Sequence, residues 1–114
     1  MQTNEIIKGT LGTIILKLLQ ENGSMYGYDI TREVKLRTDG KILLKEGSLY
    51  PALHKLLADG LVRTEEKSVG NRTRIYYSLT ASGKKQMAPR LEEMVSIMDT
   101  VRFLLTSKNT ISHA

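Results

Sequence analysis

Three stretches with helical spacing are followed by two strand-like runs, and this order constrains the fold more than any other feature of the sequence. Apolar residues recur at helical spacing over residues 7–19, and an Asn-Gly pair marks the end of this first helix. A second helix is predicted from apolar residues spaced four apart over residues 26–34, with Ser24 as its N-cap. Both helices have one apolar face and therefore need a neighbour to bury it.

A third helix is predicted over residues 48–59. Its apolar residues form a single stripe: Leu49, Ala52, Leu53, Leu56 and Leu57. Gly60 follows at the position where a left-handed residue ends a helix. Pro51 falls in the expected first turn, where its missing N–H has no partner within the helix. The short apolar segment 42–44 before this helix suits a single extended pairing.

Two strand-like runs, residues 61–66 and 74–79, come after the third helix. In the second run Ile75 and Tyr77 alternate with more polar neighbours, which is the period of a strand with one buried face. Gly70 lies between the runs and is followed by an asparagine, a common turn signal. These residues predict a β-hairpin with a basic tip.

A long helix is predicted after the hairpin, with Thr80 as its N-cap. Its apolar residues are spaced four and three apart in alternation, as in a coiled-coil seam. The seam comprises Met87, Leu91, Met94, Met98, Val101 and Leu105. Such a narrow seam requires a partner helix, so we expect this helix to form a dimer. Residues 107–114 show no periodicity and are expected to be frayed.

Three short helices followed by a two-stranded hairpin are typical of the winged helix-turn-helix, in which the third helix enters the DNA major groove. We therefore predict a mainly α (α+β) fold. Residues 1–79 are expected to form the winged helix-turn-helix domain, and residues 80–106 the C-terminal dimerisation helix.

The composition excludes several other classes of protein. The 114 residues suggest one domain, and the absence of cysteine excludes disulfides and cysteine metal sites. The two histidines lie far apart in sequence, no catalytic or phosphate-binding motif occurs, and we expect neither enzymatic activity nor a metal or cofactor. No apolar run exceeds three residues, so we expect a soluble, cytoplasmic protein.

The net charge of +5 is concentrated in one part of the chain. Between residues 67 and 91 there are six basic and no acidic residues, and the rest of the sequence is close to neutral. Arg72 and Arg74 are two apart on an extended segment and therefore project to the same side, as a phosphate or minor-groove contact needs. A solvated charge run that protects an edge strand is the alternative interpretation.

The outer face of the third helix is small, polar and basic. Ser48 and Pro51 lie near its start, Lys55 follows on the same side, and Tyr50 and His54 form one flank. Hydroxyl, imidazole and ammonium groups of this kind bind phosphates and base edges. Alternatively, Ser48 is only a helix cap and Tyr50 only a half-buried core residue.

Four segments of the sequence match a known family. Residues 46–56 (EGSLYPALHKL), continued by DGLV at 59–62, resemble the recognition-helix signature of the PadR-like bacterial transcriptional regulators. Three further segments agree in order and spacing: KGTL at 8–11, MYGYDI at 25–30, and RIYYSLT at 74–80. The resemblance covers about residues 6 to 87 in one register and adds Lys8 and Thr10 of the first segment to the candidate DNA-binding residues.

The resemblance implies a homodimeric winged-helix repressor that binds inverted-repeat operators near its own or a neighbouring promoter. Many such repressors are released by a small-molecule effector. The single C-terminal helix is similar to the compact branch of the family, in which some members hold flat aromatic molecules between the subunits. Met94 and Ile97 are then expected near an effector site, although Met94 and Met98 also fit a simple packing role.

A second class of function remains open. A winged-helix module that binds proteins and not DNA has the same fold, but it is expected to carry acidic residues on the outer face of the third helix. Ser48, Pro51 and Lys55 include none.

Overall fold

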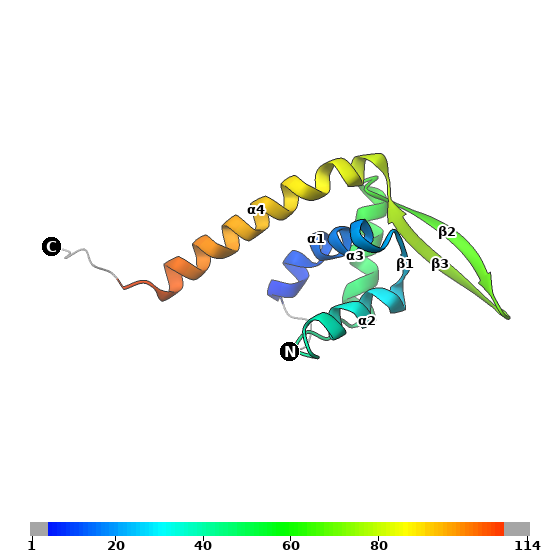
Figure 1. Ribbon diagram of the computed structural model, residues 1–114, viewed down its shortest axis with the longest axis horizontal. Helices are drawn as coiled ribbons and strands as arrows, with labels where there is room; N and C mark the ends of the chain where they lie inside the picture. The colour runs from blue at the N-terminus through cyan, green and yellow to red at the C-terminus, as the bar shows by residue number, and fades with distance from the viewer. Residues whose placement is uncertain (1–4, 109–114) are drawn as a thin grey trace.

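The computed structural model describes residues 5–108 and contains four helices and a three-stranded antiparallel sheet within that range (Figure 1). This is the mainly α winged-helix fold predicted from the sequence. The helices are α1 (Glu5–Asn22), α2 (Gly27–Arg37), α3 (Glu46–Ala58) and α4 (Ala81–Thr106). The strands are β1 (Ser24–Tyr26), β2 (Val62–Val69) and β3 (Arg72–Leu79).

The core lies where α1 meets α3, the sheet and the start of α4. Its largest fully buried side chains are Leu11, Ile15, Leu16, Leu19, Ile30, Leu49 and Leu53. The apolar stripe predicted for α3 is confirmed, because Leu49, Leu53 and Leu56 are all buried. Burying a leucine side chain contributes roughly 1.5–3 kcal/mol, so this stripe fixes which face of α3 remains outside.

The sheet contains a strand that the sequence did not predict. Its order is β1-β3-β2, and Tyr26 of β1 pairs with Tyr76 of β3. The prediction that Ser24 caps α2 is therefore wrong, since Ser24 begins β1 and Tyr26 is the N-cap. The backbone N–H of Tyr26 donates to the carboxylate of Asp29 at 3.4 Å, which satisfies a donor at this helix end.

The wing is the hairpin of β2 and β3, and both strands are longer than predicted. Gly70 has φ +63° at the turn and leads into Arg72, which pairs with Val69. Lys67 pairs with Arg74 farther along the hairpin. The outer part of the wing extends beyond the body, so neither of its faces is buried. The sequence there consequently shows no alternation of apolar and polar residues.

The start of α3 also differs from the prediction. The helix begins at Glu46 with Lys45 as its N-cap, so Ser48 is not the cap and lies within the first turn. Pro51 consequently lies inside the helix and not in its first turn. The predicted end is confirmed, because Gly60 adopts φ +71° just after the helix. The predicted pairing in segment 42–44 is confirmed as a single bridge at Leu43.

Helix α4 begins as predicted, with the backbone N–H of Gly83 donating to the Thr80 hydroxyl at 3.0 Å. Its first half packs on α1, and its second half extends away from the body (Figure 1). The structure measures 70 × 30 × 21 Å and has a radius of gyration of 17.0 Å, against about 13 Å for a compact domain of this length.

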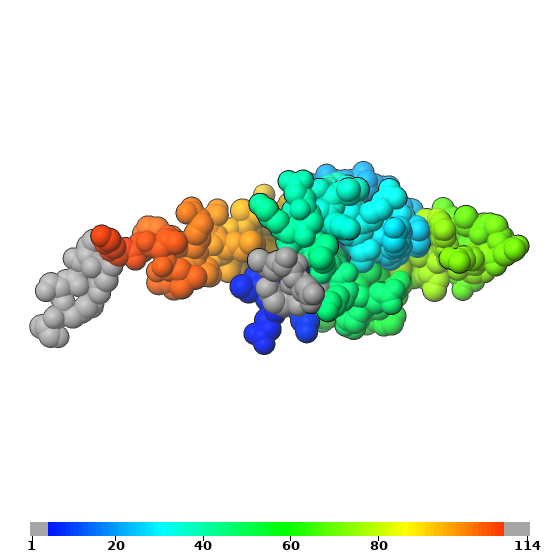
Figure 2. Space-filling model, turned by 90° about the horizontal axis from the view of Figure 1, so that it is seen from below, coloured from blue at the N-terminus to red at the C-terminus, as the bar shows by residue number. Residues whose placement is uncertain are grey.

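Figure 2 shows α4 and the wing projecting from opposite ends of the body formed by α1, α2 and α3.

No helix within residues 5–108 is both long and apolar enough to cross a membrane. Of the tail predicted to be frayed, residues 109–114 lie outside the described residues. Ser107 and Lys108 follow α4 and are exposed.

Candidate nucleic-acid interface

The outer face of α3 carries most of the side chains predicted for it. Tyr50, Pro51, His54 and Lys55 are exposed, while Ser48 is half-buried. The side opposite the buried leucine stripe carries Ser48, Pro51 and Lys55, and Tyr50 and His54 form one flank, so the packing of the core orients this face outward. The face presents a phenol, an imidazole and an ammonium group on a rigid helix, which are groups that bind phosphates and base edges.

An ion pair lies at the C-terminal end of this face. The Lys55 ammonium is 3.5 Å from the Asp59 carboxylate, one turn farther along, and both side chains are well exposed. An exposed pair of this kind contributes at most about 1 kcal/mol. The Lys55 side chain is therefore easily released to another anion.

Tyr50 lies against the first residue of α2. Its hydroxyl oxygen is 2.6 Å from the point where a Cβ would stand on Gly27, so a larger residue there would displace the end of the Tyr50 side chain. The pKa of the Tyr77 phenol is raised by burial and, to a smaller extent, by the Tyr50 phenol. Tyr50 is still 37% exposed, so it packs against α2 and also faces solvent.

Lys8 and Thr10, the two candidate DNA-binding residues that the family resemblance added, line different grooves in the structure. Lys8 lines a groove of about 420 Å³ between α1 and α3 together with Ser48, Pro51 and Lys55. Thr10 does not line this groove. Its hydroxyl donates to the carbonyl of Ile7 at 3.0 Å, and its side chain lines a different, apolar groove beside α4.

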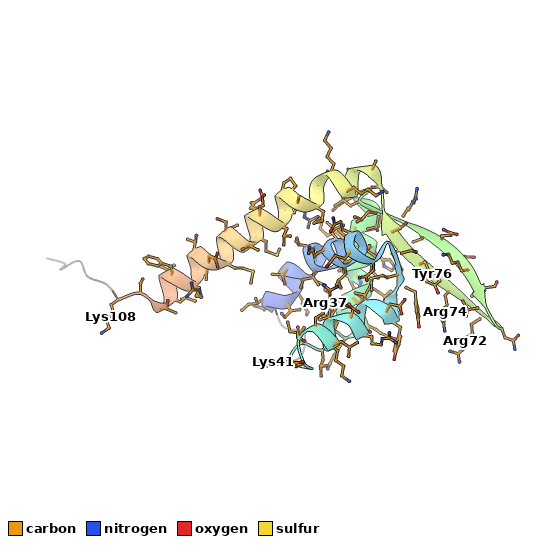
Figure 3. All side chains as sticks on the ribbon, viewed as in Figure 1. Arg37, Lys41, Arg72, Arg74, Tyr76 and Lys108 are labelled. Carbon is orange, nitrogen blue, oxygen red and sulfur yellow. The ribbon has the colours of Figure 1, made fainter. Side chains whose placement is uncertain are left out.

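The two wing arginines differ in their surroundings. Arg72 is exposed at the tip, whereas Arg74 is half-buried with its guanidinium carbon 4.6 Å from the ring centroid of Tyr26. Figure 3 shows both arginines on the same side of the wing as Tyr76. Sequence reasoning missed Tyr26 as a neighbour of Arg74. The period of β3 placed Tyr76 on the side of Arg74, but nothing indicated that β1 would pair there.

The predicted seam of α4 is buried at its start and exposed at its end. Met87 is buried, Leu91 and Met94 are half-buried, and Met98 is 51% exposed. Val101 and Leu105, the last two residues of the seam, are also exposed.

An apolar groove of about 360 Å³ lies between α1, the end of α2 and α4. Met94 lines it, but Ile97 does not and is 53% exposed elsewhere on α4, so the structure does not bring the two proposed effector residues together. Within residues 5–108 no group of three His, Asp or Glu side chains is placed to bind a metal ion.

The sequence of the chain matches the model of a family described as the transcriptional regulator PadR-like family over residues 15–89. This match covers more than half of the chain. The chain belongs to the PadR-like family. PadR-like proteins are transcriptional regulators and not enzymes, in agreement with the expectation from the sequence.

Solved structures of PadR-like and related regulators have the same fold. A transcriptional regulator from Clostridium thermocellum is 31% identical, with a TM-score of 0.79 over 87% of this chain and 96% of that chain. PadR of Bacillus subtilis, solved in complex with operator DNA, is 27% identical, with a TM-score of 0.62 over 91% of this chain and 51% of that chain.

A curated relative matches over a shorter segment. The transcriptional regulator Rv3488 of Mycobacterium tuberculosis is 47% identical over 38 residues, which are 33% of this chain and 36% of that protein.

Proposed function

We propose that this PadR-like protein is a homodimeric repressor that binds an inverted-repeat operator of its own or a neighbouring operon in the bacterial cytoplasm. The observation that carries the proposal is the outer face of α3, where Tyr50, His54 and Lys55 are exposed on a helix held by a buried leucine stripe. The solved complex of Bacillus subtilis PadR with operator DNA supports DNA as the partner.

Each subunit inserts α3 into a major groove, and the wing lies along the flanking backbone. The major groove is faced by Ser48 in the first turn of α3, Pro51 in its middle and Lys55 in its last turn. Lys8 reaches the DNA backbone from α1. Arg72 and Arg74 contact phosphates from the wing. Residues 1–79 act as the DNA-binding unit and residues 80–106 as the dimerisation helix.

The second half of α4 supports dimerisation. Met98, Val101 and Leu105 are between 44% and 76% exposed and continue a seam whose first residues are buried. Leaving three apolar side chains of one heptad seam in water is unfavourable, and a second α4 packed along the seam removes them from water. The elongated shape of the single chain agrees with a missing partner helix.

A small hydrophobic effector would bind at the apolar groove beside α4. Met94 lines this groove, and a flexible thioether adapts to ligands of irregular shape. This groove lies between α4 on one side and α1 and the end of α2 on the other. A ligand bound there therefore changes the position of the dimerisation helix relative to the DNA-binding unit.

Selection of genomic DNA fragments by the purified protein tests the proposed function. The expected result is enrichment of a palindrome whose half-sites lie one helical turn apart, about 10 base pairs centre to centre. Enrichment of no palindrome would contradict the repressor function and favour a winged-helix module that binds proteins. Lys55→Ala should weaken binding to the enriched fragment, and Lys108→Ala at the far end of the chain serves as the matched control.

A further inference from the structure

Three tyrosine rings and two cationic side chains form a connected strip between the start of α2 and the wing. The ring of Tyr26 is 6.0 Å from that of Tyr28 and 5.6 Å from that of Tyr76, measured between centroids. Arg74 lies over Tyr26 at 4.6 Å, and Lys67 lies over Tyr76 at 4.8 Å. Tyr26 is the middle of this strip, with an aromatic ring on two sides and a guanidinium over its face.

This strip continues the outer face of α3. Tyr50 of that face touches Gly27, and Gly27 directly follows Tyr26 in the chain. The surface therefore runs from α3 across the first residues of α2 to Arg74 on the wing. In helix-turn-helix proteins the helix before the recognition helix crosses the DNA backbone, so this surface faces the phosphates beside the major groove.

Among residues 5–108 no carboxylate forms an ion pair with Arg74, and its cross-strand neighbour Lys67 is also a cation. Two cations on neighbouring strands repel each other. A guanidinium over a tyrosine ring keeps its charge, and the ring face attracts the cation without offering a lone pair to its N–H groups, so these remain able to donate to an oxygen acceptor. The Tyr26 ring therefore holds Arg74 in place and leaves its donors available to phosphate.

We propose that Tyr26 is a positioning residue for DNA binding, which acts by holding Arg74 toward a backbone phosphate beside the groove that α3 enters. This inference rests on the proposed function. It adds an uncharged residue to the arginines on the wing side of the interface. Tyr26 affects the phosphate contact only by positioning Arg74.

A double-mutant cycle between Tyr26→Leu and Arg74→Gln tests the proposal. The probe is a duplex that the unmodified protein selects from a random-sequence pool, and the affinity is measured over a range of salt concentrations. Arg74→Gln is expected to lower the magnitude of the slope of log K against log salt by about 0.9. Tyr26→Leu is expected to weaken binding by about threefold and to lower the slope as well, although it removes no charge.

In the Arg74→Gln background, Tyr26→Leu should have no further effect, because its role depends on the arginine. Tyr26→Phe keeps a ring under the guanidinium and should bind within about twofold of the unmodified protein. Lys108→Gln at the far end of α4 removes one charge away from the wing and should leave the slope unchanged (Figure 3).

A Tyr26→Leu variant with an unchanged salt slope, or with the same loss of affinity in both backgrounds, would overturn the proposal. If Tyr26→Leu does not fold, as judged by its thermal midpoint, Arg74→Lys replaces it. Lysine keeps the charge but lacks the planar guanidinium that lies over the Tyr26 ring, so a several-fold loss supports the proposal and an unchanged affinity contradicts it. Failure of the unmodified protein to select any duplex contradicts the proposed function itself.

Discussion

The hydroxyl of Tyr50 on α3 lies 2.6 Å from the position of a Cβ on Gly27, so the first residue of α2 sets where this ring can lie. Gly27→Ala should displace the end of the Tyr50 side chain, because two atoms cannot approach this closely. The ring is at the far end of a side chain that is 37% exposed, so we expect little loss of stability. DNA affinity should fall several-fold if Tyr50 is part of the interface.

Binding to the selected duplex and urea unfolding check this prediction together. Gly9→Ala is the matched control for stability, because a Cβ on Gly9 meets nothing within 4 Å and the residue lies inside α1. It should raise the free energy of unfolding by about 0.5–1 kcal/mol. A Gly27→Ala variant that binds DNA as well as the unmodified protein would exclude a role for the Tyr50 position.

Gly83→Ala should destabilise the fold. A Cβ on Gly83 would collide with the backbone carbonyl of Leu61, and this carbonyl is held in place by the N–H of Thr80 at 3.1 Å. Since a backbone group cannot rotate away, α4 must move off the body. We expect a loss of about 1–3 kcal/mol in urea unfolding, opposite in sign to the effect of Gly9→Ala. An unchanged stability would show that the start of α4 is not fixed as described.

An ion pair that depends on pH joins the end of α1 to the end of α2, and a second pair lies within α2. The Arg37 guanidinium donates to Glu21 and to Glu33 at 2.8 Å each. The hydrogen bond from Arg37 lowers the pKa of Glu21 below its usual 4.5, although partial burial acts in the opposite direction. A carboxyl whose folded pKa is lowered stabilises the protein above its unfolded pKa, and this contribution is lost as the pH falls through the folded value.

Glu21→Gln should therefore reduce stability slightly near neutral pH and have no effect at a pH well below 4.5. Urea unfolding of the variant and of the unmodified protein across this range measures the difference. The two curves should converge at acid pH. A constant difference at all pH values would mean that the effect of the substitution does not come from the charge on Glu21.

Val101→Glu should convert the proposed dimer to a monomer. Val101 is 44% exposed in the single chain and lies on the α4 seam, so a glutamate there is tolerated in the monomer but buries two like charges in a dimer. Ser96→Glu, on the opposite side of the same helix, is the matched control and should remain dimeric. Sedimentation velocity separates the two states. A dimeric Val101→Glu variant would exclude a seam centred on this residue.

Much of the fold follows from local patterns in the sequence. The apolar stripe of α3 and the Thr80 cap were predicted correctly because each depends on residues within one or two turns. The turn at Gly70 also has a local signal. The start of α3 was misplaced because Glu46 precedes the first apolar residue of the stripe and has no side-chain cap.

Long-range pairing accounts for the larger errors. Strand β1 has only three residues, which is too few for the alternation that predicts a strand. It forms because Tyr26 pairs with Tyr76 some fifty residues later. The same pairing brings Tyr26 under Arg74. The exposed face of α3 was predictable from helical spacing alone, whereas the contact between the Tyr26 ring and Arg74 of the wing was not.

Equilibrium binding to an operator-sized duplex tests the central claim most directly. The purified protein, titrated against a duplex selected from genomic DNA, should bind at submicromolar concentration with two chains per duplex. A random duplex of equal length should bind at least about a thousandfold more weakly at the same salt concentration. Equal affinity for the two duplexes, or no binding to either, would contradict the account.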